Sequence, residues 1–319
     1  MPATPARAAE RQAWPQAAIR LFFAAEPESP AGILARVLSH RLVEALGQQV
    51  YVEHRPGEGG RIASDAVAAA APDGLTWLAA DDRHPLSALR AGLPFDLSKA
   101  LQPVTQVAGR DGPLLVAHPT LPARSVGELA VLATQKGRTL ELGVGGGDGD
   151  GDPAIALAAG LLRAALGPAL LPRTSPAGEP ALGELLAGRT LLGFVDAHDA
   201  DAALRASKLR ALAVAGPARL AAWPALPTLV ESKVAGADVG RIDLAGWHGL
   251  WLPAGTPAGI GVRLQADVAL ALKRPGMPER LAELGYRPVA STPEAFAAFI
   301  GSESARLRGL ASRAGWPVR

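Results

Sequence analysis

The sequence contains no cysteine among its 319 residues. This absence excludes disulfide bonds, thiolate metal sites and a cysteine nucleophile. Aromatic residues make up only 4% of the chain and its basic residues form no block, so nucleic acid is not an expected partner. The longest apolar run, 154–171, is interrupted by Arg163, Gly167 and Pro168, and it predicts a buried helix and its exit rather than a membrane span.

The composition is that of a well-packed protein. Apolar residues make up 49% of the chain and charged residues 19%, which supplies a sizeable core and argues against extensive disorder. The length suits two domains of ordinary size or one large α/β unit. The net charge is only +2, because 32 basic residues are nearly balanced by 30 acidic ones.

Strand-like and helix-like patterns alternate in the first part of the chain. The expected segments are strands at 19–25, 49–54 and 75–80, with helices at 33–46 and 61–71 between them. Ser29 followed by Pro30 is typical of the cap and first residue of a helix, and Gly47 is typical of a helix end. This order predicts a parallel, doubly wound sheet.

A second series of elements begins near residue 118. The expected segments are helices at 125–136, from Pro153 and at 179–188, with strands at 140–144, 190–196 and 209–215. A strand at 246–253 and three helical stretches close the sequence. The last helix is expected over 293–313, with Thr292 as its cap and Pro293 as its first residue.

A glycine-rich loop, GVGGGDGDGD at 143–152, stands before one of these helices. Such a loop usually holds an anion on its backbone N–H groups. Asp148, Asp150 and Asp152 should repel an anion at this position. Asp152 precedes Pro153 and is a good helix cap, whereas the other two aspartates either face water or face a ligand.

Several stretches together resemble the solute-binding proteins of tripartite tricarboxylate transporters, also called Bug proteins. Residues 33–80, with RPGEGG and APDGLTWLAA, are similar to the family's first helix, second strand, Pro-Gly turn and third strand. Residues 94–108, PFDLSKALQPVTQVA, are similar to the family pattern PYDPLKDFAPVSLVA. Further matches at 116–133, 204–231 and 246–257 keep the family's order, so the resemblance covers nearly the whole chain.

The resemblance implies a type II periplasmic-binding-protein fold, an α/β architecture with two lobes facing each other across a cleft. Lobe 1 is expected from 18–117 plus 236–319 and lobe 2 from 118–235, after an N-terminal extension of 1–17. Ligands in such folds lie between the lobes, near strand ends and helix N-termini. The implied function is extracytoplasmic binding of a small organic solute without catalysis or cofactor. A membrane transporter or a sensor is the implied partner.

The family's glycine-rich loops are altered in this chain. The stretch AAEPESPAG at 24–32 replaces a family loop of the form PFPPGGGTD, so Glu28, Ser29 and Pro30 stand where the family has glycines. Pro30 removes a backbone donor, and Glu26 and Glu28 add negative charge unless they point to solvent. Asp196 aligns with a family aspartate, while the family's Tyr-Lys-Gly motif is replaced by PRTSPAGEP at 172–180.

The segment DDRHPLS at 81–87 follows the third strand. Arg83 there either binds a ligand carboxylate or faces solvent, paired with Asp81 or Asp82. The residues expected to contact the ligand are Glu26, Pro27, Ser29, Asp82, Arg83, His84, Gly145, Gly146, Asp148, Thr174 and Asp196. This set predicts a cleft that disfavours simple di- and tricarboxylates. The expected ligand is a small organic solute that is amino-acid-like, neutral, cationic or another carboxylate.

Other functions fit the sequence less well. An EF-hand counted from Asp148 fails, because its twelfth position is Ala159, but a looser metal site or an enzyme that uses the acidic loop 148–152 stays open. Loss of ligand binding also stays open. No G-x-S-x-G motif is present, and the dinucleotide fingerprint fails at Asp148.

Residues 1–23 show no uninterrupted secretory signal, so a periplasmic location rests on the resemblance, with the cytoplasm as the alternative.

Overall fold

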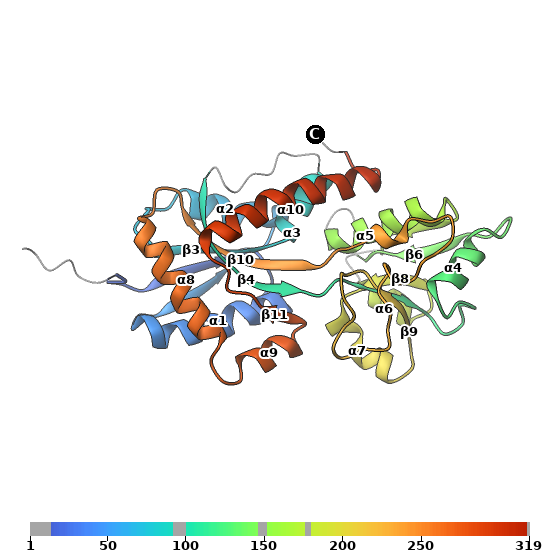
Figure 1. Cartoon of the computed structure of the whole chain (residues 1–319), viewed down its shortest axis with the longest axis horizontal. Helices are drawn as coiled ribbons and strands as arrows, with labels where there is room; N and C mark the ends of the chain where they lie inside the picture. The colour runs from blue at the N-terminus through green and yellow to red at the C-terminus, as the bar shows by residue number, and fades with distance from the viewer. Residues whose placement is uncertain (1–13, 92–99, 146–151, 176–179, 318–319) are drawn as a thin grey trace, which may run out of the picture.

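The computed structural model describes residues 14–91, 100–145, 152–175 and 180–317. Two β-sheets lie side by side along its long axis, and each is covered by helices (Figure 1). Among the described residues, no helix is both long enough and apolar enough to cross a bilayer.

The first sheet has the strand order β11-β4-β10-β3-β1-β2. Its strands are β1 (Ile19–Phe23), β2 (Val50–His54), β3 (Thr76–Asp81), β4 (Leu101–Arg110), β10 (Gly246–Pro253) and β11 (Tyr286–Pro288). β1 pairs in parallel with β2 and β3, which confirms the parallel arrangement expected for the first three strands. β10 pairs antiparallel with β3 and β4, so the C-terminal part of the chain completes the sheet that the N-terminal part begins.

The second sheet has the strand order β7-β6-β8-β5-β9. Its strands are β5 (Leu114–Ala117), β6 (Leu140–Gly143), β7 (Leu170–Arg173), β8 (Leu192–Val195) and β9 (Arg210–Val214). β6 pairs in parallel with β7 and β8, whereas β5 pairs antiparallel with β8 and β9. Every strand of this sheet therefore comes from one continuous part of the chain.

Helices cover both faces of each sheet. They are α1 (Pro30–Leu46), α2 (Arg61–Ala68), α3 (Arg83–Arg90), α4 (Val126–Ala133), α5 (Pro153–Leu166), α6 (Ala181–Leu186), α7 (Ala197–Arg205), α8 (Ala258–Leu272), α9 (Met277–Glu283) and α10 (Pro293–Arg313). On the first sheet, α1, α8 and α9 pack on one face and α2 and α10 on the other. On the second, α4 and α5 pack opposite α6 and α7. This layering covers both faces of each mixed sheet, whose strands are largely buried.

The expected helix caps are present. The side-chain oxygens of Ser29, Asp152 and Thr292 each accept a backbone N–H in the first turn of α1, α5 and α10, and a proline follows each cap. Gly47 ends α1 in the left-handed conformation, with φ of 66°. The boundaries of these helices thus follow from local chemistry that the sequence already displays.

Other segments differ from the expectation. The third strand was expected to end at residue 80, but β3 extends to Asp81, which is still paired in the sheet, and α3 begins at Arg83. The run 154–171, expected as a helix and its exit, also contains the beginning of β7. That strand is only four residues long, which is too short for periodicity to separate it from the preceding helix.

The chain passes between the two sheets at two segments that both lie next to Ala215. One lies between Arg110 and Leu114, earlier than the expected position near residue 118, and the other lies at Ala245, between Leu244 in the core of the second sheet and Gly246 at the start of β10. The Ala215 N–H donates to the Pro113 carbonyl at 2.8 Å. A Cβ on Gly112 would lie 1.9 Å from the Ala215 carbonyl oxygen, so the first crossing packs backbone against backbone on the residue that follows β9. The same carbonyl accepts the Leu244 N–H at 2.9 Å, next to the second crossing.

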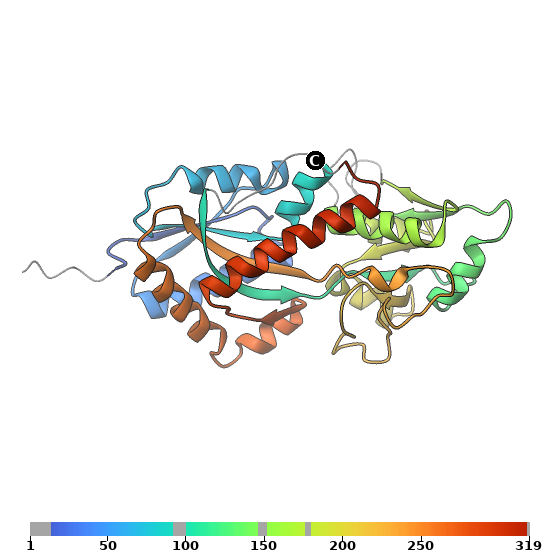
Figure 2. The ribbon, with the colours of Figure 1, turned by 45° about the horizontal axis from the view of Figure 1, so that its top comes forward.

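The final helix contacts both parts of the molecule. Phe296, near the start of α10, is fully buried against Trp247 and Trp251 of β10. Leu307 and Ala311, near its end, belong to the core of the second sheet. Figure 2 shows α10 running from the first sheet towards α5. The helix therefore packs across the junction of the two sheets.

We expect Phe296→Ala to lower the free energy of unfolding by about 3–5 kcal/mol, because it removes a ring enclosed by two tryptophans and leaves a cavity. Urea denaturation followed by circular dichroism measures the change. Leu270→Ala on α8 is the control, since Leu270 is 63% exposed and its truncation should change stability by less than about 0.5 kcal/mol. Equal effects of the two substitutions would contradict the assigned core.

Candidate functional site: the cleft between the two sheets

The turn between β1 and α1 forms one wall of the site. The Ser29 hydroxyl accepts the Gly32 N–H at 3.0 Å and donates to the Glu26 carbonyl at 2.7 Å. The turn packs tightly on the helix, because a Cβ on Gly32 would lie 2.3 Å from that carbonyl oxygen. The Ser29 side chain is thus committed to local structure, while Glu26 and Glu28 are exposed.

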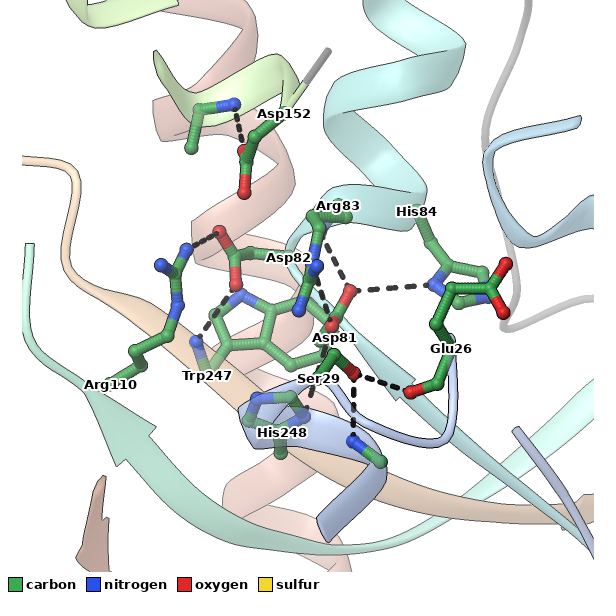
Figure 3. Close-up of polar contacts among 12 residues, drawn as sticks. Glu26, Ser29, Asp81, Asp82, Arg83, His84, Arg110, Asp152, Trp247 and His248 are labelled. Atoms are coloured by element: carbon green, nitrogen blue, oxygen red, sulfur yellow. Dashed lines mark hydrogen bonds and ion pairs between the residues drawn. The ribbon is translucent and has the colours of Figure 1, made fainter. Parts of the chain in front are cut away.

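Charged side chains gather where β3 runs into α3 (Figure 3). Arg83 donates its backbone N–H and its Nε to the Asp81 carboxylate at 3.0 and 3.1 Å. Nδ1 of His84 and of His248 lie 3.7 and 3.9 Å from the same carboxylate. Of the two neighbouring aspartates, Arg83 therefore pairs with Asp81, although the Arg83 side chain remains 31% exposed.

Arg110, the last residue of β4, holds two further carboxylates. Its Nη2 lies 3.2 Å from Asp82 Oδ2, and its Nη1 lies 2.6 Å from Asp196 Oδ1. Asp82 Oδ1 also accepts the backbone N–H of Trp247 at 3.3 Å. Asp82 belongs to the first sheet's side of the molecule, whereas Asp196 follows β8 of the second sheet. One guanidinium thus joins residues from both sides.

Two cavities open between these elements. The first, here called the cleft cavity, has a volume of about 520 Å³ and is lined from both sides, by Arg83, Arg110 and Tyr286 on one and by Asp152 and Asp196 on the other. The second, here called the glycine-turn cavity, has a volume of about 570 Å³ and is lined by the turn 56–60 and by His84. The two share Ser29, Arg83 and Asp152, so they adjoin.

Acidic groups outnumber basic ones around the cleft cavity. Among the described lining residues, the carboxylates are Glu28, Asp111, Asp152, Asp196 and Asp199, and the guanidiniums are Arg83 and Arg110. Both guanidiniums already have carboxylate partners. A ligand anion entering this cavity would have to compete with those partners.

Burial changes the protonation of the groups behind the cavity. Burial raises the pKa of Asp82 to about 6, although the Arg110 charge opposes the change. Burial also acts to raise the pKa of Asp81, but Arg83 and His84 outweigh it and the pKa lies well below its ordinary value. Burial lowers the pKa of His248 to about 3, so this imidazole is neutral at pH 7.

Comparison with known proteins identifies the fold. Residues 34–315 match the family model of the tripartite tricarboxylate transporter family receptor. The chain belongs to this family. Its members are periplasmic solute-binding proteins with two α/β parts, and the two helix-covered sheets described above have the same architecture. The expected family and fold class are thereby confirmed.

Relatives and solved structures match nearly the full length of the chain. BugT of Bordetella pertussis is 29% identical over 306 residues, which are 95% of this chain and 90% of BugT. The structure of R. palustris Rpa4515 with adipate has a TM-score of 0.76 and 28% identity, and covers 95% of this chain and 99% of that one. MatC from Rhodopseudomonas palustris with bound malate has a TM-score of 0.74 and 26% identity, and covers 93% and 99%.

The residues expected to bind ligand lie in different places. Ser29, Arg83, Gly145 and Asp196 line the cleft cavity, while Glu26 and His84 line the glycine-turn cavity. Asp82 is buried behind Arg110, and Pro27 lines neither cavity. Thr174 lines a separate cavity with Arg163 and Trp316. Gly146 and Asp148 lie outside the described residues.

Arg110 has a place in the site that sequence reasoning missed. It stands directly before Asp111-Gly112-Pro113, where the chain leaves the first sheet. A charged residue at the end of a long, mostly buried strand was the available signal.

The sequence also left a looser metal site open. The described residues contain no group of three or more potential ligands placed to hold a metal ion.

We expect Asp82→Asn to change how stability depends on pH. Because the folded protein raises the pKa of Asp82, the stabilisation linked to its protonated form is present below about pH 4 and is lost as the pH rises through about 6. Asparagine has no such titration. The unfolding free energy of the variant relative to wild type should therefore rise between pH 4 and 7, by at most a few kcal/mol, since one pKa unit corresponds to about 1.4 kcal/mol.

Urea denaturation at both pH values measures this difference. Asp201→Asn is the control, because the hydrogen bond from Arg205 lowers the pKa of Asp201 and its titration therefore lies below about pH 4. The stability difference between that variant and wild type should stay nearly constant from about pH 4 to 7. A constant difference for Asp82→Asn across this range would show that the buried carboxyl is not the titrating group.

Proposed function

We propose that this chain is an extracytoplasmic receptor that binds a small organic solute between its two sheets and presents it to a membrane transporter or sensor. The observation that carries this proposal is the cleft cavity, which is lined by residues from both sheets next to the segments that connect them. Family membership supports the same function. No catalytic step is part of the proposal.

The connecting segments suit a hinge. The connections at 111–113 and at Ala245 are short, and both lie next to Ala215, which packs on Gly112 and accepts the Leu244 N–H. A rotation about these segments changes the distance between the two walls of the cavity. A solute that contacts both walls favours the closed arrangement, since it interacts with both only there.

The charges around the cavity disfavour simple di- and tricarboxylates. Two like charges about 4 Å apart repel by roughly 4 kcal/mol at an effective dielectric constant of 20. A helix N-terminus stabilises an anion at an exposed site by only about 0.3–1 kcal/mol. Both arginines of the cavity already carry carboxylates, so neither offers a free positive charge to a second or third carboxylate of the ligand.

This proposal separates the chain from two of its structural relatives. Rpa4515 holds adipate and MatC holds malate, so similarity alone would suggest a dicarboxylate. In this chain Glu28, Ser29 and Pro30 stand in the turn at the start of α1, and Glu28 lines the cavity. A cavity wall with more carboxylates than free cations is a reason to expect a different solute.

We expect succinate, malate and citrate to bind with dissociation constants above 10 μM, which corresponds to binding free energies weaker than about −7 kcal/mol. Isothermal titration calorimetry on the purified protein measures the constants. A constant below 10 μM for any of the three would show that the acidic residues do not set the ligand class.

A thermal-shift panel of amino acids, amines and neutral solutes is the companion experiment. A solute that binds only the folded state raises the unfolding free energy by about 2.7 kcal/mol at a concentration of one hundred times its dissociation constant. At least one solute is expected to give such a shift. Failure of every organic solute at millimolar concentration would contradict the receptor function.

A further inference from the structure

One ion pair connects the two walls of the cleft cavity. Arg110 Nη1 and Asp196 Oδ1 are 2.6 Å apart, and both residues line the cavity. The Arg110 side chain is only 8% exposed, whereas that of Asp196 is 30% exposed. Asp196 is therefore the partner that a solute in the cavity can reach and replace.

The other side of Arg110 is fixed. Asp82 holds Nη2 and is itself buried, with the Trp247 N–H as a further donor (Figure 3). A Cβ on Gly246 would lie 2.5 Å from Asp82 Oδ1 and 2.8 Å from Arg110 Nε. The Arg110 guanidinium and the Asp82 carboxylate thus pack directly against the backbone of β10. No ligand fits between these two groups.

Replacing Asp196 on Arg110 leaves an uncompensated carboxylate. Asp152, which caps α5, and Asp199, one turn into α7, line the same cavity and add negative charge. Arg83 does not relieve it, because Asp81 already balances its charge. A solute that brings only carboxylates to Arg110 therefore gains one ion pair and breaks another.

We propose that the Arg110–Asp196 pair is the specificity determinant of this cleft and that it selects zwitterions, solutes that carry both a carboxylate and an ammonium group. The carboxylate takes the place of Asp196 on Arg110, and the ammonium group pairs with the released Asp196. Both charges of the original pair then keep a partner. This inference rests on the proposed receptor function and names the solute class of the same site.

Two matched solute pairs test the selection. Glutarate and 4-aminobutanoate share a carboxylate and three methylenes, and differ only in whether the far end is a carboxylate or an ammonium group. Succinate and 3-aminopropanoate form the same comparison with two methylenes. Calorimetry on the wild type should show each amino acid binding at least about tenfold tighter than its dicarboxylate, which corresponds to about 1.4 kcal/mol.

The variant Asp196→Asn removes the charge that the ammonium group pairs with and keeps the shape of the side chain. We expect it to lower the preference for the amino acid over the matched dicarboxylate at least about tenfold. Asp199→Asn is the matched control, because Asp199 lines the same cavity and is not bonded to Arg110. It should keep most of the wild-type preference. Thermal melts of each variant check that folding is intact.

The outcomes separate this inference from the receptor function. Equal or tighter dicarboxylate binding to the wild type, an unchanged preference in Asp196→Asn, or an equal loss in Asp199→Asn would each overturn the selection by Arg110 and Asp196. A tightly bound solute that lacks one of the two charges would overturn it as well. These results leave the receptor function standing, whereas the absence of binding by every organic solute would remove both.

Discussion

A buried guanidinium needs its charge balanced, and in this protein that requirement fixes the centre of the molecule. Arg110 is almost fully enclosed and is held by Asp82 from one sheet's side and by Asp196 from the other. Burial of an unpaired charge is strongly unfavourable, so Arg110 keeps Asp82 as its buried partner and needs a second carboxylate, which Asp196 supplies here. The Arg110–Asp196 ion pair therefore holds the two walls of the cleft cavity together and supplies two of the charges that line it.

The connections around this centre are compact. Two chain segments cross between the sheets, at 111–113 and at Ala245, and both lie next to Ala215, which packs on Gly112 and accepts the Leu244 N–H. The final helix adds a third link, since Phe296 packs on the first sheet and Leu307 in the core of the second. Any rotation of one sheet against the other would have to be accommodated by α10, which packs on both sides of the junction. The proposed receptor function therefore couples closure of the cavity to packing of the C-terminal helix.

The cleft combines a family architecture with local chemistry of its own. Proteins of similar structure have been solved with adipate and with malate, and this chain shares their two helix-covered sheets. In this chain, Ser29 uses its hydroxyl to cap α1, and Arg83 and Arg110 are paired with aspartates. Architecture therefore explains where a solute lies, while the identity of the solute depends on charges that the architecture leaves free to vary.

The sequence by itself determined the local elements and the family. Ser29-Pro30 and Thr292-Pro293 start helices because a side-chain oxygen and a fixed φ act within a few residues, and the order of the motifs identifies the receptor family. Only the tertiary structure decided the partners of the charged residues. Arg110 and Asp196 are 86 positions apart, and Arg83 had two adjacent aspartates to choose from. Ion pairs depend on distances that strand order and sheet packing impose, and no spacing along the chain encodes those distances.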